Sequence, residues 1–334
     1  MLVAIGDLHL SDSREWSYDV SERVVDYIIK WNMNNPTHSA IFLGDFTEDT
    51  LLTGRLFSLM LKLFTSLRFK KTYVIVGNHD LKKDKNNNLY LAFEFLRHPL
   101  FKDKIEIIES LYGKTIEGLD CLILPWLHPD GKHSVKDYEN PESLGVYTKK
   151  TEWDVVFAHF QDVSSEKQGD KVNIDYINTK FHCIGHIHKP SQRYIGSVIP
   201  NKWDERNEIR SVRFYAREEG KAVETIYPLP VFTDYYSIKF PEPLPKVPAQ
   251  VPVWTIFNCK DEATARQQYG EIYIRKALYD IAMDNEALAD LNHSMVTKDK
   301  ISIDKMFNSW LDEAKLEPEV KKLAREYFIV GSGN

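Results

Sequence analysis

Cysteine is scarce in this chain, and its few cysteines are poorly spaced for cross-linking. The 334 residues contain only Cys121, Cys183 and Cys259, an odd number with no close pair. This pattern excludes a disulfide framework and a thiolate zinc site, and it favours buried structural thiols. We therefore expect a protein of a reducing, intracellular compartment.

Long apolar runs and a strong charge of one sign are also missing. No run approaches the roughly 20 apolar residues of a membrane span, and residues 1–6 lack the basic and apolar regions of a signal peptide. A formal net charge of -6 argues against a uniformly basic, non-specific nucleic-acid binder. It does not exclude a phosphate substrate, because bound divalent cations would dominate the local field. We expect a soluble cytoplasmic protein with no membrane partner.

Short β-rich runs alternate with amphipathic helical patterns in the first part of the chain. Residues 2–5, 39–43 and 72–76 are predicted strands. Two helical stripes separate them, formed by Val20, Val24, Tyr27, Ile28 and Trp31 and by Leu52, Leu56, Leu59, Leu63 and Leu67. The alternation predicts βαβ units and an α/β fold with a mostly parallel sheet.

A cluster of prolines between residues 228 and 252 predicts a domain boundary, because proline disfavours a continuous helix. We predict domains at 1–230, 231–295 and 296–334. The second has a predicted strand at 253–257 and a predicted helix at 272–282, and the last is predicted to be helical.

Five short strings of polar residues each follow a predicted strand. They are Asp7-Leu8-His9, Gly44-Asp45, Gly77-Asn78-His79-Asp80, Ala158-His159 and Gly185-His186-Ile187-His188. Because ligand clefts lie beyond the carboxyl ends of the strands in open α/β sheets, side chains placed there can converge. Carboxylate, amide and imidazole groups are ligands for manganese, iron or zinc. Any one string could be an ordinary turn, but together they predict a metal site.

A single carboxylate can bridge two cations, and such a pair can generate hydroxide near neutral pH and stabilise the charge of a phosphoryl group. Asp45 stands alone after its strand and suits this bridge. The sequence therefore predicts a two-metal phosphoesterase.

These strings resemble the motifs of the calcineurin-like metallophosphoesterase family, and all five occur in the family's order. The resemblance implies a two-sheet αββα sandwich with a smaller C-terminal α+β capping region and terminal helices. It implies that one metal is held by Asp7, His9, Asp45 and His188, and the other by Asp45, Asn78, His159 and His186. It further implies that His79 contacts the scissile phosphate and protonates the leaving oxygen, oriented by Asp80.

Weaker features are similar to the SbcD-type (Mre-type) nuclease subunit, including its phage-encoded relatives. They are the strings at 122–126, 194–197 and 205–208. This resemblance implies a manganese-dependent DNA nuclease that works with an SbcC-type coiled-coil ATPase through the helices of 296–334. Whether the chain also forms a homodimer stays open. Glu48 departs from the pattern, because nucleases of this type often carry a histidine there. We interpret it as a solvated loop acid in preference to a partner of a ligand histidine.

Two other readings stay open beside the nuclease. The same metal chemistry serves a phosphodiesterase or phosphatase that acts on a small phosphoester, whereas a non-catalytic scaffold would be expected to lose ligands. Gly113-Lys114-Thr115 resembles the end of a phosphate-binding loop, but the upstream glycine is replaced by Ile108, so an intrinsic ATPase is rejected. The basic residues Lys82, Lys83, Lys85, Lys321, Lys322 and Arg325 could contact a nucleic-acid backbone or simply be solvated.

Overall fold

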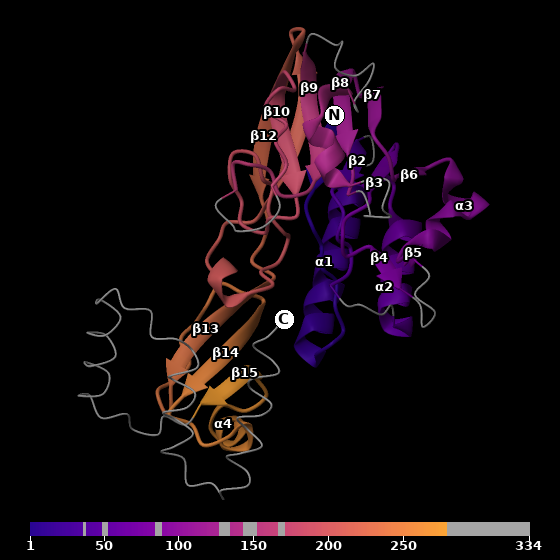
Figure 1. The fold of residues 1–334 in the computed structure, drawn as a ribbon. Coiled ribbons are helices and arrows are strands. Elements are labelled where there is room, and N and C mark those ends of the chain that lie inside the picture. Colours follow the sequence, from indigo (N-terminus) through magenta and orange to yellow (C-terminus); the bar gives the residue numbers. More distant parts are fainter. Residues whose placement is uncertain are drawn as a thin grey trace, which may run out of the picture. The chain divides into compact units, whose positions relative to one another are not determined.

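The computed structural model describes residues 1–35, 38–48, 53–83, 89–126, 134–142, 152–165 and 171–278, and all of them belong to one compact unit. Figure 1 shows the arrangement of the elements. Their bounds are β1 Leu2–Ile5, α1 Glu15–Asn34, β2 Ser39–Phe42, α2 Gly54–Ser66, β3 Thr72–Ile75, β4 Leu81–Lys83, β5 Leu89–Leu91, η1 Glu94–Arg97, α3 Pro99–Lys102, β6 Ile105–Ile108, β7 Tyr112–Ile116, β8 Leu119–Leu124, η2 Val135–Glu139, β9 Trp153–His159, β10 Thr179–Gly185, η4 Trp203–Glu205, β11 Ser211–Glu218, β12 Lys221–Pro228, β13 Thr233–Lys239, β14 Val251–Phe257, α4 Glu262–Tyr269 and β15 Tyr273–Leu278.

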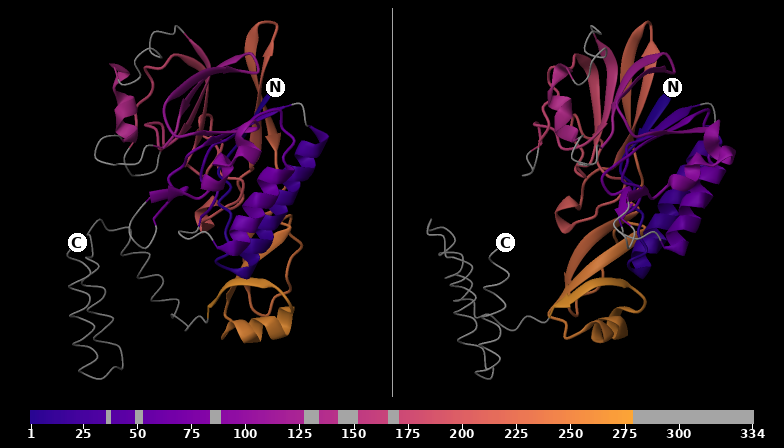
Figure 2. Two further views of the ribbon diagram at one scale, coloured as in Figure 1. Left: turned by 90° about the vertical axis from the view of Figure 1, so that its right-hand side faces the viewer. Right: turned by 45° about the vertical axis from the view of Figure 1, so that its right-hand side comes forward.

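The first sheet has six strands in the order β12-β11-β1-β2-β3-β6. Strands β1, β2, β3 and β6 run parallel, with Ala4 opposite Ile41 in the register, and β11 and β12 add an antiparallel edge. The two long helices α1 and α2 connect the parallel strands and lie side by side on one face of this sheet (Figure 2). The predicted βαβ units are therefore confirmed.

A second sheet, of order β10-β9-β8-β7, packs against the other face of the first. Alternation along β1 shows why its sequence is wholly apolar. Leu2 and Ala4 join a buried cluster with Ile123 and Phe157 of the second sheet, whereas Val3 points the other way, into the cluster formed with the helices. Because successive side chains point to opposite faces, a strand covered on both faces must be apolar at every position. This is the expected two-sheet sandwich.

The outer face of the second sheet is covered by a short 3-10 helix and by loops in the described part of the chain. Leu122, Val156 and Ile184 from this sheet pack with Tyr138 of η2 and with Val172. In the expected order of helix, sheet, sheet and helix layers, the last layer is therefore formed by a short 3-10 helix and loops, which pack on the sheet through apolar side chains.

The three parallel strands β13-β14-β15 and helix α4 form a smaller sheet with its own buried cluster, which includes Trp254, Ile256 and Ala265. The predicted strand at 253–257 is confirmed, but the predicted helix at 272–282 is wrong, since β15 occupies Tyr273–Leu278. Pairing of β15 with β14 decided this, because a short apolar segment is ambiguous between helix and strand. The boundary after residue 230 stays a prediction, and 296–334 lies outside the described residues.

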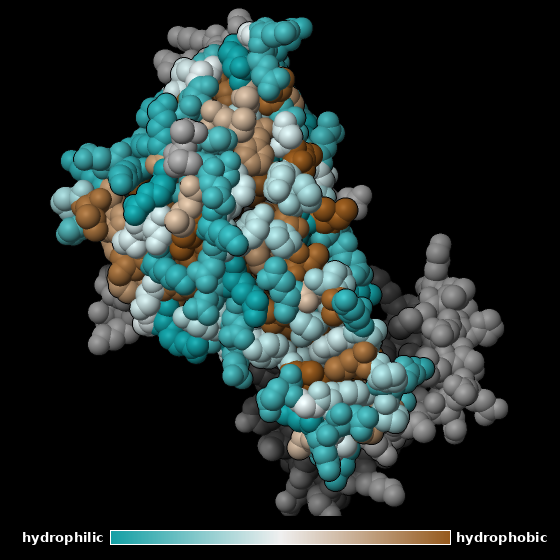
Figure 3. Space-filling model, turned by 180° about the vertical axis from the view of Figure 1, so that it is seen from behind, coloured by the Kyte–Doolittle hydropathy of each residue, from teal (hydrophilic) through white to brown (hydrophobic). Residues whose placement is uncertain are grey.

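The surface of the described unit is of mixed polarity. On the face drawn in Figure 3, hydrophobic residues are interspersed among hydrophilic ones. None of the helices in the described segments is long and apolar enough to cross a membrane.

Candidate metal centre

The predicted ligands lie just beyond the carboxyl ends of parallel strands from both large sheets. Asp7 follows β1, Asp45 follows β2 and Asn78 follows β3, while His159 ends β9 and His186 follows β10. The two sheets therefore contribute to one site, as the strand-end positions of the strings predicted.

Several ligand residues have unusual backbone conformations. The φ angles of His9, Asp45 and His186 are 45°, 50° and 75°, in a left-handed region that costs a residue with a side chain about 1 to 3 kcal/mol. The glycines of the strings allow close approach: a Cβ at Gly77 would overlap Oδ1 of Asp45, and a Cβ at Gly185 would lie 2.6 Å from Oδ1 of Asp7. The strings thus encode tight turns as well as ligands.

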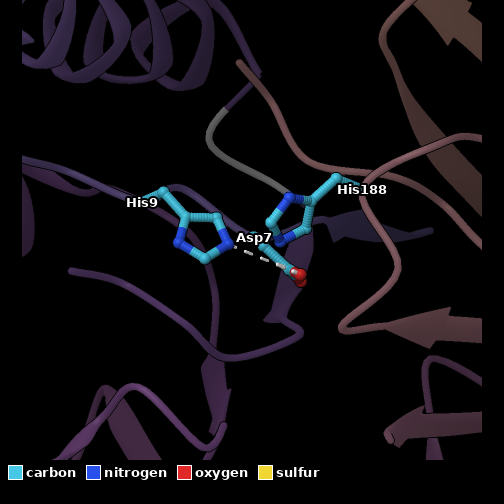
Figure 4. A group of neighbouring side chains, drawn as sticks. All are labelled: Asp7, His9 and His188. Atoms are coloured by element: carbon cyan, nitrogen blue, oxygen red, sulfur yellow. Dashed lines mark ion pairs between the residues drawn. The ribbon is translucent and has the colours of Figure 1, made fainter. Parts of the chain in front are cut away.

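Asp7, His9 and His188 form the first ligand group. One ligand atom from each lies within 4.8 Å of the others, and Figure 4 shows the three side chains turned toward one another. Nε2 of His9 lies 3.9 Å from Oδ2 of Asp7, and both side chains are fully buried. The backbone N–H of His186 donates to Oδ2 of Asp7 over 2.8 Å and fixes this carboxylate.

Asp45, His159 and His186 form the second ligand group, again with ligand atoms within 4.8 Å of one another. Nε2 of His159 lies 3.2 Å from Oδ2 of Asp45. Asn78 joins this group through Oδ1, which lies 3.1 Å from Nε2 of His159 and 2.8 Å from Nδ1 of His186. His186 and His188 therefore belong to different groups.

One oxygen atom faces both groups. Oδ2 of Asp45 lies 3.2 Å from Nε2 of His159 in the second group and 3.9 Å from Nε2 of His9 in the first. Oδ1 of the same carboxylate accepts a hydrogen bond from the backbone N–H of His79 over 2.8 Å. Asp45 therefore has the placement of a bridging ligand.

Burial and crowding perturb the ionisation of these groups. Burial tends to raise the pKa of Asp45, but the neighbouring His159 overrides it and holds the pKa far below the usual range. Burial tends to lower the pKa of His159, but the carboxylate of Asp45 outweighs it and raises the pKa to about 10. The pKa of His186 falls to about 3 through burial and through repulsion by His159. Burial and the neighbouring side chains therefore set the ionisation of all three residues.

The chemistry of this donor set fits divalent cations. Oδ1 of Asp7 and Nε2 of His9 are buried, and neither has a hydrogen-bond partner among the described residues. Leaving such groups unpaired in a protein interior is costly, and a bound cation would satisfy both. The carboxylates and imidazoles belong to the ligand types of manganese, iron and zinc centres, so the residues present suit the two cations that the sequence predicted.

His79 and Asp80 occupy different surroundings. The ring of His79 lies beside that of His9, with centroids 5.3 Å apart, and its side chain is 37% exposed. Asp80 is fully buried, and its carboxylate accepts hydrogen bonds of 2.8 Å from the backbone N–H groups of Asp45, Phe46 and Gly77. The contacts of Asp80 therefore fasten the Asp45 turn to the Gly77 turn, and it supports the His79 segment through the backbone.

Two glutamates contact the Nδ1 atoms of His9 and His188. Oε2 of Glu48 lies 2.6 Å from Nδ1 of His9, so the interpretation of Glu48 as a simple solvated acid is corrected. Oε1 of Glu205, a fully buried residue, lies 2.9 Å from Nδ1 of His188. Such partners fix the orientation of a ligand ring and leave its Nε2 free for a cation. No role for Glu205 was predicted, although it lies in the 205–208 string.

The strings at 122–126, 194–197 and 205–208 each contact a residue of this centre. The indole of Trp126 stacks on the ring of His186 with centroids 5.7 Å apart. The backbone N–H of Ser197 donates to the carbonyl oxygen of His188 over 3.2 Å. Oε1 of Glu205 lies 2.9 Å from Nδ1 of His188, and the nearby Arg210 donates to the carbonyl oxygens of His188 and Glu205. These strings thus buttress the metal ligands.

The structure leaves the role of the basic candidates a prediction. The backbone of Lys82 and Lys83 belongs to β4. Lys85 and the basic residues Lys321, Lys322 and Arg325 lie outside the described residues.

Comparison with known proteins identifies the family. The model of the calcineurin-like phosphoesterase family matches residues 1–190, more than half of the chain, and the chain belongs to this family. Membership implies metal-dependent phosphoester hydrolysis. Among curated proteins, none matches this chain.

Two solved structures are similar to parts of the chain. A protein of unknown function from Aquifex aeolicus is 18% identical, covers 54% of this chain and 87% of its own, and has a TM-score of 0.26. A single mutant of Vps29 from Entamoeba histolytica is 11% identical, covers 68% and 98%, and has a TM-score of 0.27. Likeness at this level says nothing about substrate.

Proposed function

We propose that this calcineurin-like phosphoesterase is a two-metal DNA nuclease that hydrolyses phosphodiester bonds. The observation that carries the proposal is the position of Oδ2 of Asp45, within 3.9 Å of a histidine from each ligand group. A carboxylate so placed would serve two cations at once, as two-metal hydrolysis of phosphoesters requires.

The proposed ligands divide between two sites. Asp7, His9 and His188 would hold one cation, Asn78, His159 and His186 the other, and Asp45 both. Such a pair of cations supplies an activated water near neutral pH and the charge that stabilises a phosphoryl group. The protein holds the ligand rings through Glu48, Glu205 and the Leu43 carbonyl, so the site is preorganised before substrate arrives.

His79 is the proposed general acid. Its side chain is partly exposed and lies beside His9. Its backbone N–H donates a hydrogen bond to Oδ1 of Asp45, which holds the residue at the site. A protonated imidazole there can give its proton to the leaving oxygen as the phosphodiester breaks. Because Asp80 bonds backbone groups on both sides of the site, we assign it the positioning of this loop.

DNA is preferred to a small phosphoester because the strings at 122–126, 194–197 and 205–208, which contact the proposed metal ligands, resemble the SbcD-type subunit. Trp126 stacks on His186, and Glu205 approaches Nδ1 of His188. On the same grounds we propose manganese as the metal and an SbcC-type coiled-coil ATPase as a partner that docks on residues 296–334.

The test is digestion of end-labelled linear duplex and single-stranded DNA by the purified chain in manganese, with EDTA as the control and a bis-aryl phosphodiester as a competing substrate. Shortening of DNA that EDTA abolishes is the expected result. Turnover of the small diester without any cleavage of DNA would contradict the nuclease assignment and favour the small-phosphoester enzyme.

The role of His79 is tested with His79→Ala, which should keep two metals per chain and the wild-type melting temperature but lose about 100-fold or more in kcat. His98→Ala, at an exposed histidine outside the ligand groups, is the matched control and should be unchanged in kcat and in metal content. Full turnover by His79→Ala would remove His79 from catalysis.

A further inference from the structure

A cleft of about 260 Å³ adjoins the candidate metal centre. His9 and Glu48 lie at its metal end, and its walls include Arg14 at the start of α1 and Arg275 from β15. The cleft is therefore shared by the phosphoesterase sheet and by the smaller C-terminal sheet. A ligand in it would extend directly to the metal ligands.

Arg275 is held in the cleft by aromatic rings. Its guanidinium lies 5.6 Å from the ring centroid of Trp203 and 5.6 Å from that of Tyr235, within the range of a cation–π contact. The rings are themselves packed, because Tyr235 meets Trp203 at 6.2 Å and Trp16 at 6.1 Å. These contacts fix the stem and the plane of the guanidinium and leave its N–H groups free to donate.

Arg14 stands at the N-terminus of the twenty-residue helix α1, where the helix dipole adds positive potential. Among the residues that the structure describes, the guanidinium groups of Arg14 and Arg275 form no ion pair with a carboxylate. Glu48 is the acid that lines the cleft, and it is engaged with Nδ1 of His9. Two uncompensated arginines in one cleft of a chain with net charge -6 favour an anionic ligand.

We propose that Arg14 and Arg275 form a second phosphate subsite, which binds the phosphate next to the scissile one in a single strand of nucleic acid. The proposal rests on the proposed nuclease function and deepens it. Arginine guanidinium groups donate in a fork that matches phosphate oxygens. A volume of 260 Å³ is slightly below the roughly 300 to 1,000 Å³ of ligand clefts, which suits about one nucleotide of a single strand.

The test compares two substrates that differ in their number of phosphates. One is a bis-aryl phosphodiester, with a single phosphate, and the other is a short single-stranded oligonucleotide. Arg14→Gln and Arg275→Gln should each raise KM for the oligonucleotide about tenfold, since a charge-assisted hydrogen bond is lost. Both should leave kcat and the kinetics of the small diester within twofold of wild type.

Salt dependence gives a second readout of the same variants. The log of the affinity falls as the log of the salt concentration rises. Each lost phosphate contact should make this negative slope shallower by about 0.7 for a single strand. Arg23→Gln, at an exposed arginine of α1 outside the cleft, is the matched control and should change neither quantity. Arg275→Lys keeps the charge but loses the donor fork, so it should recover only part of the lost affinity.

The outcomes separate this inference from the proposed function. If wild type cleaves the oligonucleotide and the glutamine variants keep its KM and salt slope, the subsite is wrong while the nuclease stands. If wild type turns over the diester but no oligonucleotide, the nuclease itself is wrong. Equal loss on both substrates in either variant would also overturn the subsite, because these arginines would then act at the metal centre.

Discussion

The two ligand groups of the metal centre are built from the same residue types but are supported differently. In the first group, Nδ1 of His9 and Nδ1 of His188 lie 2.6 Å and 2.9 Å from glutamate oxygens. In the second, Nδ1 of His159 lies 2.6 Å from the carbonyl oxygen of Leu43. Charged carboxylates therefore support the first group, and a neutral backbone carbonyl supports His159 of the second.

This difference implies that the affinities of the two groups for a cation depend on different kinds of supporting contact. A carboxylate behind an imidazole raises its basicity and strengthens it as a ligand, whereas a backbone carbonyl chiefly fixes its orientation. The first site should therefore depend on side chains that mutation can remove. The second should depend more on the backbone and should tolerate changes in its surroundings.

The largest effect is expected where the two groups meet. Asp45→Asn removes the charge of the carboxylate that faces both groups, so the metal content should fall from two ions per chain to one or none. Activity should fall by about 100-fold or more. Metal analysis after dialysis and kinetics with a small diester check this, with the exposed Asp103→Asn as the control. Two tightly held ions in Asp45→Asn would refute the bridging role.

An intermediate effect is expected at Gly77, in the turn that precedes Asn78 of the second group. In Gly77→Ala the new Cβ would overlap Oδ1 of Asp45, and such overpacking costs about 1 to 3 kcal/mol of unfolding free energy. At Gly54, the first residue of α2, a Cβ meets nothing within 4 Å, so Gly54→Ala should change stability by less than about 1 kcal/mol. Denaturant melts of both variants measure the contrast. Equal stability of the two would show that the turn can relax.

The smallest effects should rank the two glutamates of the first group. Glu205 is fully buried and also accepts a hydrogen bond of 2.8 Å from the backbone N–H of Asn201. Glu205→Gln should therefore lower the affinity for the first cation about 10- to 100-fold. Glu48 is 43% exposed, and because solvent screens its charge, Glu48→Gln should cost less than about tenfold. Calorimetric metal titration should show the second cation unchanged in both. Equal weakening of both cations would break the contrast between the groups.

Local pattern in the sequence predicted much of the fold and most of the centre. Apolar strands 2–5, 39–43 and 72–76 and the stripes of α1 and α2 follow from periodicity, and polar strings at strand ends indicated the ligands. Prediction failed at β15, where Tyr273–Leu278 reads as part of a helix until its pairing with β14 is known. The interpretation of Glu48 as a solvated acid was also wrong, and no role was predicted for Glu205.

These failures share one physical reason. Pairing, burial and ring orientation depend on residues distant in the chain: 179 positions separate His186 from the Asp7 carboxylate that its backbone N–H reaches. The sequence by itself determined which side chains could bind metal, because residue type and strand-end position are local properties. Only the tertiary structure decided how they divide into two groups, which acids stand behind them, and that Arg14 and Arg275 share a cleft. Sheet register and packing bring such residues together, and no local pattern records them.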